Sequence, residues 1–322
     1  MGIKRKIWKT YAFTKQVLLE FTNSNGMKFS AALSYYTVFA IAPVMVIIIS
    51  LCGVLFGQES VKGELFVQVN QLVGAQAAAQ VQDIILKVHK SGQGVFATIV
   101  SSTVLLIAAT SIFGEIQDSI NKIWGLKSKP KKAWWKMILN RIISFSLILS
   151  VGFVLMISLL MNAMVAALSG YLQKHIPGSG AIFIQVVNQL LSFTITTFIF
   201  AMIFKILPDA HITWKDVIKG ALLTAILFTL GKLGIGYYVG RSKLDDLYGA
   251  AASIIILMVW VYYSAIILYI GAAFTKVYAR HYGGKIRPNQ YAVWVALQEV
   301  EVKKLVIKTD VEEPEKKLNT TI

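Results

Sequence analysis

Few side chains of this chain are candidates for binding or transport, and they lie inside long apolar stretches. Lys232 is the one charged residue deep within such a stretch, and Gln185, Gln189 and Ser192 follow one another at steps of four and three in another. Those steps place the three polar side chains on one face of a helix. In lipid, polar side chains either bond a neighbouring helix or line a wet path. The candidates for such a path are Ser34, Thr37, Ser158, Asn162, Gln185, Gln189, Ser192 and Lys232.

Two interpretations of these residues stay open on the sequence alone. Hydrogen bonds between helices account for uncharged polar stripes without any pathway. Lys232 can likewise extend its apolar stem so that its ammonium reaches the outer interface. Against this, three separate predicted spans contribute polar residues, and a charge inside a span is a functional candidate by default. Asp245 and Asp246, in the segment that follows Lys232, are its candidate partners.

The residue types that enzymes use show no catalytic spacing. The four histidines are scattered over His89, His175, His211 and His281, without an HxH or HExxH motif. No GxSxG motif occurs, and Gly231-Lys232 lacks the remaining residues of a GxxxxGK[ST] phosphate loop. A nuclease would need clustered carboxylates and histidines. The sequence therefore predicts no catalytic residue, no metal and no cofactor, and it disfavours a nuclease or any other enzyme.

The apolar stretches are long enough to cross a membrane. Hydrophobic residues make up 56% of the chain and charged residues 15%, whereas globular domains are about a quarter charged. The run from 247 to 275 is free of charge. As a helix it would be about 44 Å long, against a hydrocarbon core of about 30 Å. The predicted fold is an all-α, polytopic integral membrane protein.

Six transmembrane helices are predicted within a membrane domain of residues 29–279, at about 29–58, 91–114, 142–173, 181–204, 214–240 and 247–276. Residues 1–28 form a basic amphipathic arm at the membrane surface, and residues 280–322 form a polar, partly disordered tail. Glycines four residues apart, which let two helices approach closely, occur as Gly53 with Gly57 and as Gly236 with Gly240.

Amphipathic surface helices are predicted after the first two spans. After the second, one face carries Phe113, Ile116, Ile120 and Ile123, and the opposite, solvent face carries Gln117, Asp118, Asn121 and Lys122. Before the fifth span, Thr213 with Asp216 three residues later predicts a helix N-cap.

Basic residues are distributed unevenly between the two sides of the predicted membrane. Of the 32 lysines and arginines, twenty-five fall on the side of the two termini, six fall on the other side, and Lys232 lies within a span. Basic residues collect in cytoplasmic loops, so both termini are predicted to be cytoplasmic. This placement explains the net charge of +16 without a nucleic-acid partner. The expected partners are the bilayer, anionic lipids at the cytoplasmic face and, in a homo-oligomer, further copies of the chain.

Several segments carry motifs of a known family. The first span reads Ala32-Leu-Ser-Tyr-Tyr-Thr37 with Pro43, Asn121 and Trp124 follow the second, and the last reads Tyr248-Gly-Ala, Ser253, Trp260-Val-Tyr-Tyr-Ser264 and Gly271-Ala272. Over roughly residues 10–285 the chain resembles the BrkB/YihY family of bacterial inner-membrane proteins, historically labelled ribonuclease BN-like. The resemblance implies a six-helix protein of the bacterial cytoplasmic (inner) membrane, often described as a transporter or permease.

One position departs from the family pattern. Many members continue the last motif as Gly-Ala-Glu, whereas this chain has Gly271-Ala272-Ala273. A mechanism that relied on a carboxylate at that position is therefore not expected here.

The leading functional prediction is a permease or exporter of unknown substrate, with a cavity lined by the third and fourth spans. Transport would be passive or gradient-driven, because no nucleotide-binding motif is present. The alternative is a non-transporting membrane scaffold that holds lipid or protein partners on its basic surface. A polar cavity that reaches the middle of the bilayer distinguishes the two.

Overall fold

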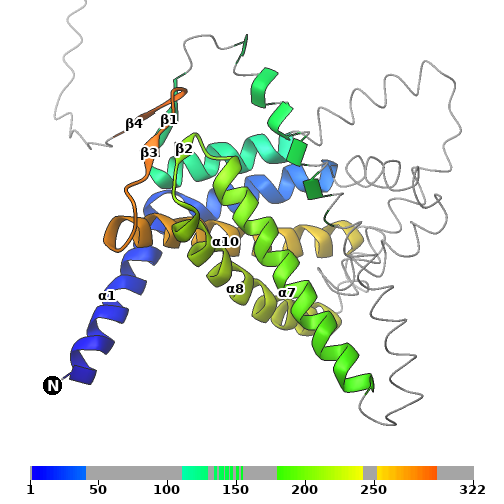
Figure 1. Cartoon of the computed structure of the whole chain (residues 1–322). Coiled ribbons are helices and arrows are strands. Elements are labelled where there is room, and N and C mark those ends of the chain that lie inside the picture. Colours follow the sequence, from blue (N-terminus) through cyan, green and yellow to red (C-terminus); the bar gives the residue numbers. More distant parts are fainter. Residues whose placement is uncertain are drawn as a thin grey trace, which may run out of the picture.

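The described part of the chain is mostly helical (Figure 1). The computed structural model describes residues 2–40, 111–129, 180–241 and 252–295, and short pieces between residues 134 and 154. Its helices are α1 (Gly2–Asn23), one over residues 26–40, one over residues 111–124, α7 (Gly180–Ile206), α8 (Trp214–Arg241) and α10 (Ala252–His281). Its strands are β1 (Leu126–Ser128), β2 (Ala210–His211), β3 (Arg287–Pro288) and β4 (Ala292–Trp294).

Three of the described helices are long and apolar enough to cross a membrane. The candidate spans are Val186–Ile206 in α7, Trp214–Ile235 in α8 and Ile254–His281 in α10. A largely helical, membrane-type chain is thus confirmed, and the three helices lie over the last three predicted spans. The other predicted spans fall wholly or partly outside the described residues, so the total of six stays a prediction.

Helices α8 and α10 run antiparallel in close contact. A Cβ added to Gly220 would come within 1.8 Å of Thr275 Oγ1, and one added to Gly271 within 1.9 Å of Thr224 Oγ1. Each threonine donates its hydroxyl at 2.7 Å to the carbonyl of the glycine four residues earlier on its own helix. Small residues let the two backbones approach, and both hydroxyls are satisfied inside an apolar interface. We call these four residues the Gly–Thr contact.

The N-terminal helices join α10 from two directions. Helix α1 projects from the body of the molecule (Figure 1) and packs on α10 through its later turns. A turn then changes the direction of the chain at Asn25, whose φ of 60° is a conformation that asparagine tolerates well. The helix over residues 26–40 follows, and the Ser34 hydroxyl donates to the Met258 carbonyl of α10 at 2.7 Å. A hydrogen bond therefore ties the first predicted span to the last.

One end of this helix group collects basic side chains. It is the end where α7 and α10 finish and α8 begins, and it carries Lys205, Lys215, Lys219, Lys276 and Arg280. We call it the basic end, and the opposite end of the α7–α8–α10 group the far end.

The N-cap predicted at Thr213 is confirmed. Its hydroxyl accepts the Asp216 backbone N–H at 3.4 Å and donates to Asp216 Oδ2 at 2.8 Å. The same carboxylate accepts the Gly284 N–H at 3.0 Å. An acid in the first turn of a helix is stabilised by the helix dipole, and here it also connects α8 to the segment after α10.

Two short antiparallel ladders, β1–β4 and β2–β3, hold the segment after α10 against the helices. Ile286 and Ala292 of this segment are buried. Residues 282–295 of the predicted polar tail are therefore ordered, because strand pairing and buried apolar side chains fix them. The rest of the predicted tail lies outside the described residues.

The helix over residues 111–124 buries part of its predicted solvent face. Gln117 and Asn121 donate to the Asp209 carboxylate at 3.2 and 3.1 Å, and the Asp209 backbone N–H donates to Asn121 Oδ1 at 2.8 Å. The prediction is correct for Asp118 and Lys122, which are exposed, and wrong for Gln117 and Asn121. A buried carboxylate needs hydrogen-bond donors, and Asp209 comes from the distant α7–α8 connection.

Two further bonds fasten this helix to α10 at the basic end. The buried Trp124 indole donates to the Ala272 carbonyl at 3.0 Å. The Lys276 ammonium donates to the Ile123 carbonyl at 2.7 Å and forms an ion pair with Glu20 of α1. The basic end therefore joins three helices through a buried cation.

We expect Gly220→Ala to lower stability, although alanine is the better helix former, because its methyl group would overlap the Thr275 hydroxyl. The expected loss is about 1–3 kcal/mol, as in overpacked cores, and is measured as a lower Tm in detergent. Gly234→Ala is the matched control, since a Cβ there has no neighbouring atom within 4 Å. It should keep or raise Tm, because alanine favours a helix by about 1 kcal/mol. Equal Tm values would contradict the close contact.

Asn121→Ala is expected to destabilise the protein by about 2–3 kcal/mol, because it leaves the buried Asp209 carboxylate and backbone N–H short of partners. Lys122→Ala, on the exposed face of the same helix, is the control. Its loss should stay within about 1 kcal/mol, the value of its cation–π contact with Phe29. Denaturant unfolding of both variants measures the difference, and similar losses would refute the buried network.

Candidate functional site

Lys232 lies in the far half of α8 with a half-buried side chain. The helix rise places it about 20 Å from Lys219, toward the far end of the candidate span Trp214–Ile235. Its neighbour Gly231 faces Tyr263 of α10, whose hydroxyl would lie 2.1 Å from an added Cβ. Lys232 and Tyr263 therefore stand at the same level of the α8–α10 pair.

A hollow of about 350 Å³ opens between α8 and α10 at this level. Its lining is apolar except for two tyrosines, and consists of Gly234, Ile235, Val259, Tyr262, Tyr263 and Ile266. Its volume is at the small end of the range for ligand sites. The helix pair is thus closed by the Gly–Thr contact in its basic-end half and hollowed in its far half. We call this space the α8–α10 hollow.

Packed aromatic and branched side chains hold the two helices beside the hollow. Ile235 and Ile256 are buried together against Trp260 and Tyr263. The rings of Phe228 and Trp260 meet edge to face with their centroids 5.9 Å apart, a geometry worth about 0.5–1.5 kcal/mol beyond its buried area. The hollow is therefore framed by fixed contacts. Lys232 stands at the same level of α8 but is not one of the lining residues. The two phenol groups can donate hydrogen bonds to an anionic group, and the apolar walls suit a partly apolar molecule.

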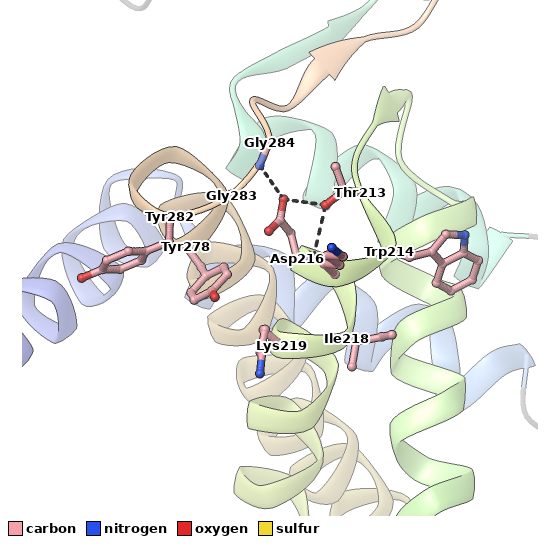
Figure 2. Close-up of a pocket in the computed structure, with 10 residues that line it drawn as sticks. Thr213, Trp214, Asp216, Ile218, Lys219, Tyr278, Tyr282, Gly283 and Gly284 are labelled. Carbon is pink, nitrogen blue, oxygen red and sulfur yellow. Dashed lines mark hydrogen bonds between the residues drawn. The ribbon is translucent and has the colours of Figure 1, made fainter.

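A second hollow, of about 850 Å³, lies at the basic end and is drawn in Figure 2. The figure shows Tyr278 and Tyr282 on one side and Trp214 on the other, with the bonded Asp216 between them. Trp214 is 52% exposed and Tyr282 is 68% exposed. Exposed aromatic side chains beside lysines are typical of a membrane–water interface. We call this space the basic-end groove; Lys215 and Lys219 also line it.

The two polar residues predicted in the first span are bonded to backbone carbonyls. Ser34 is 2% exposed and donates to Met258 of α10, while Thr37 donates to Leu33 of its own helix at 2.7 Å. In this structure both hydroxyls serve helix bonding.

Two of the predicted residues of α7, Gln189 and Ser192, do not line the hollow level with Lys232. Gln189 is exposed and Ser192 half-buried, and the Ser192 carbonyl accepts the Thr196 hydroxyl at 2.8 Å. Neither residue lines the α8–α10 hollow. The α8–α10 hollow lies between the fifth and sixth predicted spans. The cavity predicted between the third and fourth spans stays a prediction, because most of the third lies outside the described residues.

The remaining predicted residues carry no side-chain evidence. Gln185 lies in α7 with its side chain undescribed, and Gly236 and Gly240 lie in the last turns of α8. Ser158, Asn162, Gly53 and Gly57 lie outside the described residues.

Sequence reasoning missed the two tyrosines of the hollow. Tyr262 and Tyr263 stand in the motif Trp260-Val-Tyr-Tyr-Ser264, which the sequence analysis used only for its family resemblance. Two consecutive tyrosines in an apolar helix could have indicated a polar site, since a buried tyrosine hydroxyl usually needs a hydrogen-bond partner. The two tyrosines line the hollow against α8, at the level of Lys232, only because α8 and α10 pair.

Comparisons with known proteins cover most of the chain. A family model described as Virulence factor BrkB matches residues 17–293. A UPF0761 membrane protein of Teredinibacter turnerae is 25% identical over 274 residues, which are 84% of this chain and 60% of that protein. One of Saccharophagus degradans is 24% identical over 281 residues, 86% of this chain and 62% of that protein.

A UPF0761 membrane protein of Vibrio vulnificus is 28% identical over 276 residues, 82% of this chain and 81% of that protein. The chain spans only about three fifths of the length of the Teredinibacter and Saccharophagus relatives. No solved structure matches it.

Cysteine accessibility tests whether the hollow is wet. Cys52→Ala removes the single cysteine of the chain, and in that background we expect Gly234→Cys to react with a water-soluble maleimide roughly tenfold faster than Leu230→Cys. The reactive thiolate forms only where water reaches it, and Leu230 is a 62% exposed position of the same helix outside the hollow. Thr224→Cys, at a fully buried position, should not react. Equal rates at 234 and 230 would mean that the hollow is dry.

Proposed function

The chain belongs to the BrkB family of membrane proteins, and on this premise we propose that it is a permease or exporter whose substrate passes along the α8–α10 pair. The observation that carries the proposal is Lys232, a half-buried lysine within the candidate span Trp214–Ile235 and level with a hollow. A lysine within a span costs free energy on insertion, about 2.5–3.5 kcal/mol at the centre and less toward the ends. A role in substrate binding accounts for a lysine at this position.

The proposed substrate carries a negative charge. The ammonium of Lys232 and the hydroxyls of Tyr262 and Tyr263 can all donate hydrogen bonds to an anionic group. The walls of the α8–α10 hollow are otherwise apolar, so they suit a substrate with an apolar part. We therefore propose an amphipathic anion, or a small anion, as the substrate class.

Transport requires the helix pair to change its packing. The Gly–Thr contact closes the basic-end half of the pair, with Thr224 and Thr275 fully buried. A substrate could pass only if α8 and α10 separate there, as repeats or bundles move against one another in alternating access. The sequence has no nucleotide-binding motif, so the proposed movement is passive or driven by a gradient. We place the basic end in the cytoplasm of a bacterium, with both termini on that side of the inner membrane.

A non-transporting scaffold is the second candidate, and a specific observation favours it. The basic-end groove joins exposed aromatic side chains to lysines (Figure 2). Trp134 and Trp135 are also exposed, with ring centroids 5.7 Å apart. Such a surface can hold anionic lipid or a partner protein without moving any substrate.

Transport by purified protein in liposomes tests the proposal. The probes are radiolabelled inorganic phosphate, for a small anion, and a fluorescent phosphatidylglycerol, for an amphipathic one. We expect the wild type to accelerate movement of at least one probe and Lys232→Gln to slow it roughly tenfold. Loss of a charged hydrogen bond costs about 1.5–3 kcal/mol, which is a factor of ten or more.

Lys15→Gln is the matched control, because Lys15 is an exposed lysine of α1 and should leave transport unchanged. Gln189→Ala asks whether α7 contributes to the path. Equal transport by the wild type and Lys232→Gln would remove Lys232 from the mechanism. If protein-free and protein-containing liposomes moved both probes at the same rate, the scaffold would replace the permease.

A further inference from the structure

The segment after α10 forms a pocket that is separate from the proposed transport path. Its volume is about 430 Å³, and it lies at the basic end. Four of its six lining residues are cationic, and the lining consists of Lys276, Arg280, Lys285, Ile286, Arg287 and Trp294. Among the described residues no carboxylate lines it. We call it the cationic pocket.

Three of the four cations form no ion pair in the part of the chain that the structure describes. The ammonium of Lys276 is paired with Glu20 of α1. Arg280, Lys285 and Arg287 are exposed, and none of them forms an ion pair within the described residues. Three like charges around one space repel one another. An anion in the pocket would relieve that repulsion.

The dipole of α10 accounts for only part of this clustering. A cation in the last turn of a helix is stabilised by the partial negative charge there. Arg280 lies in that turn. Lys285 and Arg287 lie beyond the end of the helix, where the effect has fallen off.

The backbone that carries Lys285 and Arg287 is fixed on both sides. Gly284 donates its N–H to Asp216 at the start of α8. Arg287 belongs to β3 and pairs with His211 of β2. Between them, the Ile286 side chain is 7% exposed and therefore anchored. The pocket is thus formed before any ligand binds, which lowers the cost of binding.

The chemistry of the lining selects the type of anion. An arginine guanidinium offers parallel N–H donors that match a phosphate group, and lysine adds a compact charge. The Trp294 indole, 53% exposed, adds a flat apolar surface of the kind found at membrane interfaces. A volume of about 430 Å³ fits a phosphate ester better than a bare ion.

We propose that the cationic pocket binds a phosphate monoester or diester, held by Arg280, Lys285 and Arg287 beside Trp294. The ligand is either the headgroup of an anionic phospholipid or a soluble phosphate ester of similar size. Lys276 marks the end of the charge-free run of α10, so the pocket lies at headgroup depth. A phosphate site at this position is compatible with both a permease and a scaffold. The result of the Lys232→Gln transport experiment therefore does not bear on this proposal.

The test compares the double variant Lys285→Gln/Arg287→Gln with Lys15→Gln/Lys28→Gln, which removes two exposed lysines outside the pocket. Native mass spectrometry of the purified full chain measures binding of phosphatidylglycerol against phosphatidylcholine. Calorimetry in detergent measures binding of glycerol 3-phosphate, a soluble phosphate monoester without lipid tails. We expect the pocket variant to weaken binding of at least one phosphate probe about tenfold or more, since it removes two of the cationic groups that bind the phosphate. The control variant should change it less than twofold.

The pattern of losses identifies the source of the ligand. Weaker binding of phosphatidylglycerol alone assigns the pocket to lipid, and weaker binding of glycerol 3-phosphate assigns it to a soluble ester. Equal weakening by the pocket and control variants would show general surface charge and overturn the proposal, as would the absence of binding of either probe by the wild type. Arg287→Lys keeps the charge and loses the guanidinium fork, so it should bind phosphate with intermediate affinity. The Tm of each variant, compared with that of the wild type, separates lost binding from lost folding.

Discussion

The buried ammonium of Lys276 is the interaction on which the basic end of this protein depends. A charge removed from water must be paired and hydrogen-bonded, and Lys276 meets this requirement with Glu20 of α1 and the carbonyl of Ile123. The two partners belong to two different helices and Lys276 to a third, so satisfying one cation fixes how the three helices meet. The bond from Trp124 to Ala272, one turn earlier on α10, holds the same junction from its apolar side. The cationic pocket is built on this junction, because Lys276 also forms part of its lining.

The requirement that buried polar groups form hydrogen bonds also distinguishes the two halves of the α8–α10 pair. Between α8 and α10, Thr224 and Thr275 bond carbonyls of their own helices, and glycines opposite them let the backbones approach. In the absence of water such local bonds are the least costly way to place a hydroxyl in lipid. Farther along, Lys232 and Tyr263 occupy the level at which the pair opens into a hollow. A tight half and a hollow half in one helix pair suit a protein that moves a ligand by repacking.

Much of the fold could be predicted from the sequence, and less of the candidate site. The apolar runs predicted helices over the ranges where α7, α8 and α10 lie, and Thr213 with Asp216 predicted the start of α8. Helical periodicity placed Gln117 and Asn121 on a solvent face, because periodicity reports which residues share a face and not what covers it. Their partner, Asp209, is 88 or more residues away. Ser34 was recognised as polar within a span, but its partner is the Met258 carbonyl, 224 residues later.

The sequence by itself determined the properties that depend on neighbouring residues along one helix. These properties are the length of each apolar run compared with the membrane thickness, the residue at which each charge-free run ends, and the helix cap. They can be predicted locally, because a helix satisfies its backbone hydrogen bonds within its own segment. Tertiary structure alone decided which helices pair, and therefore that Gly220 meets Thr275, that Lys232 stands level with Tyr263, and that residues 282–295 return to build a pocket. Those outcomes depend on side-chain shape and buried charge across segments far apart in the chain. Local sequence patterns in a single chain do not predict such contacts.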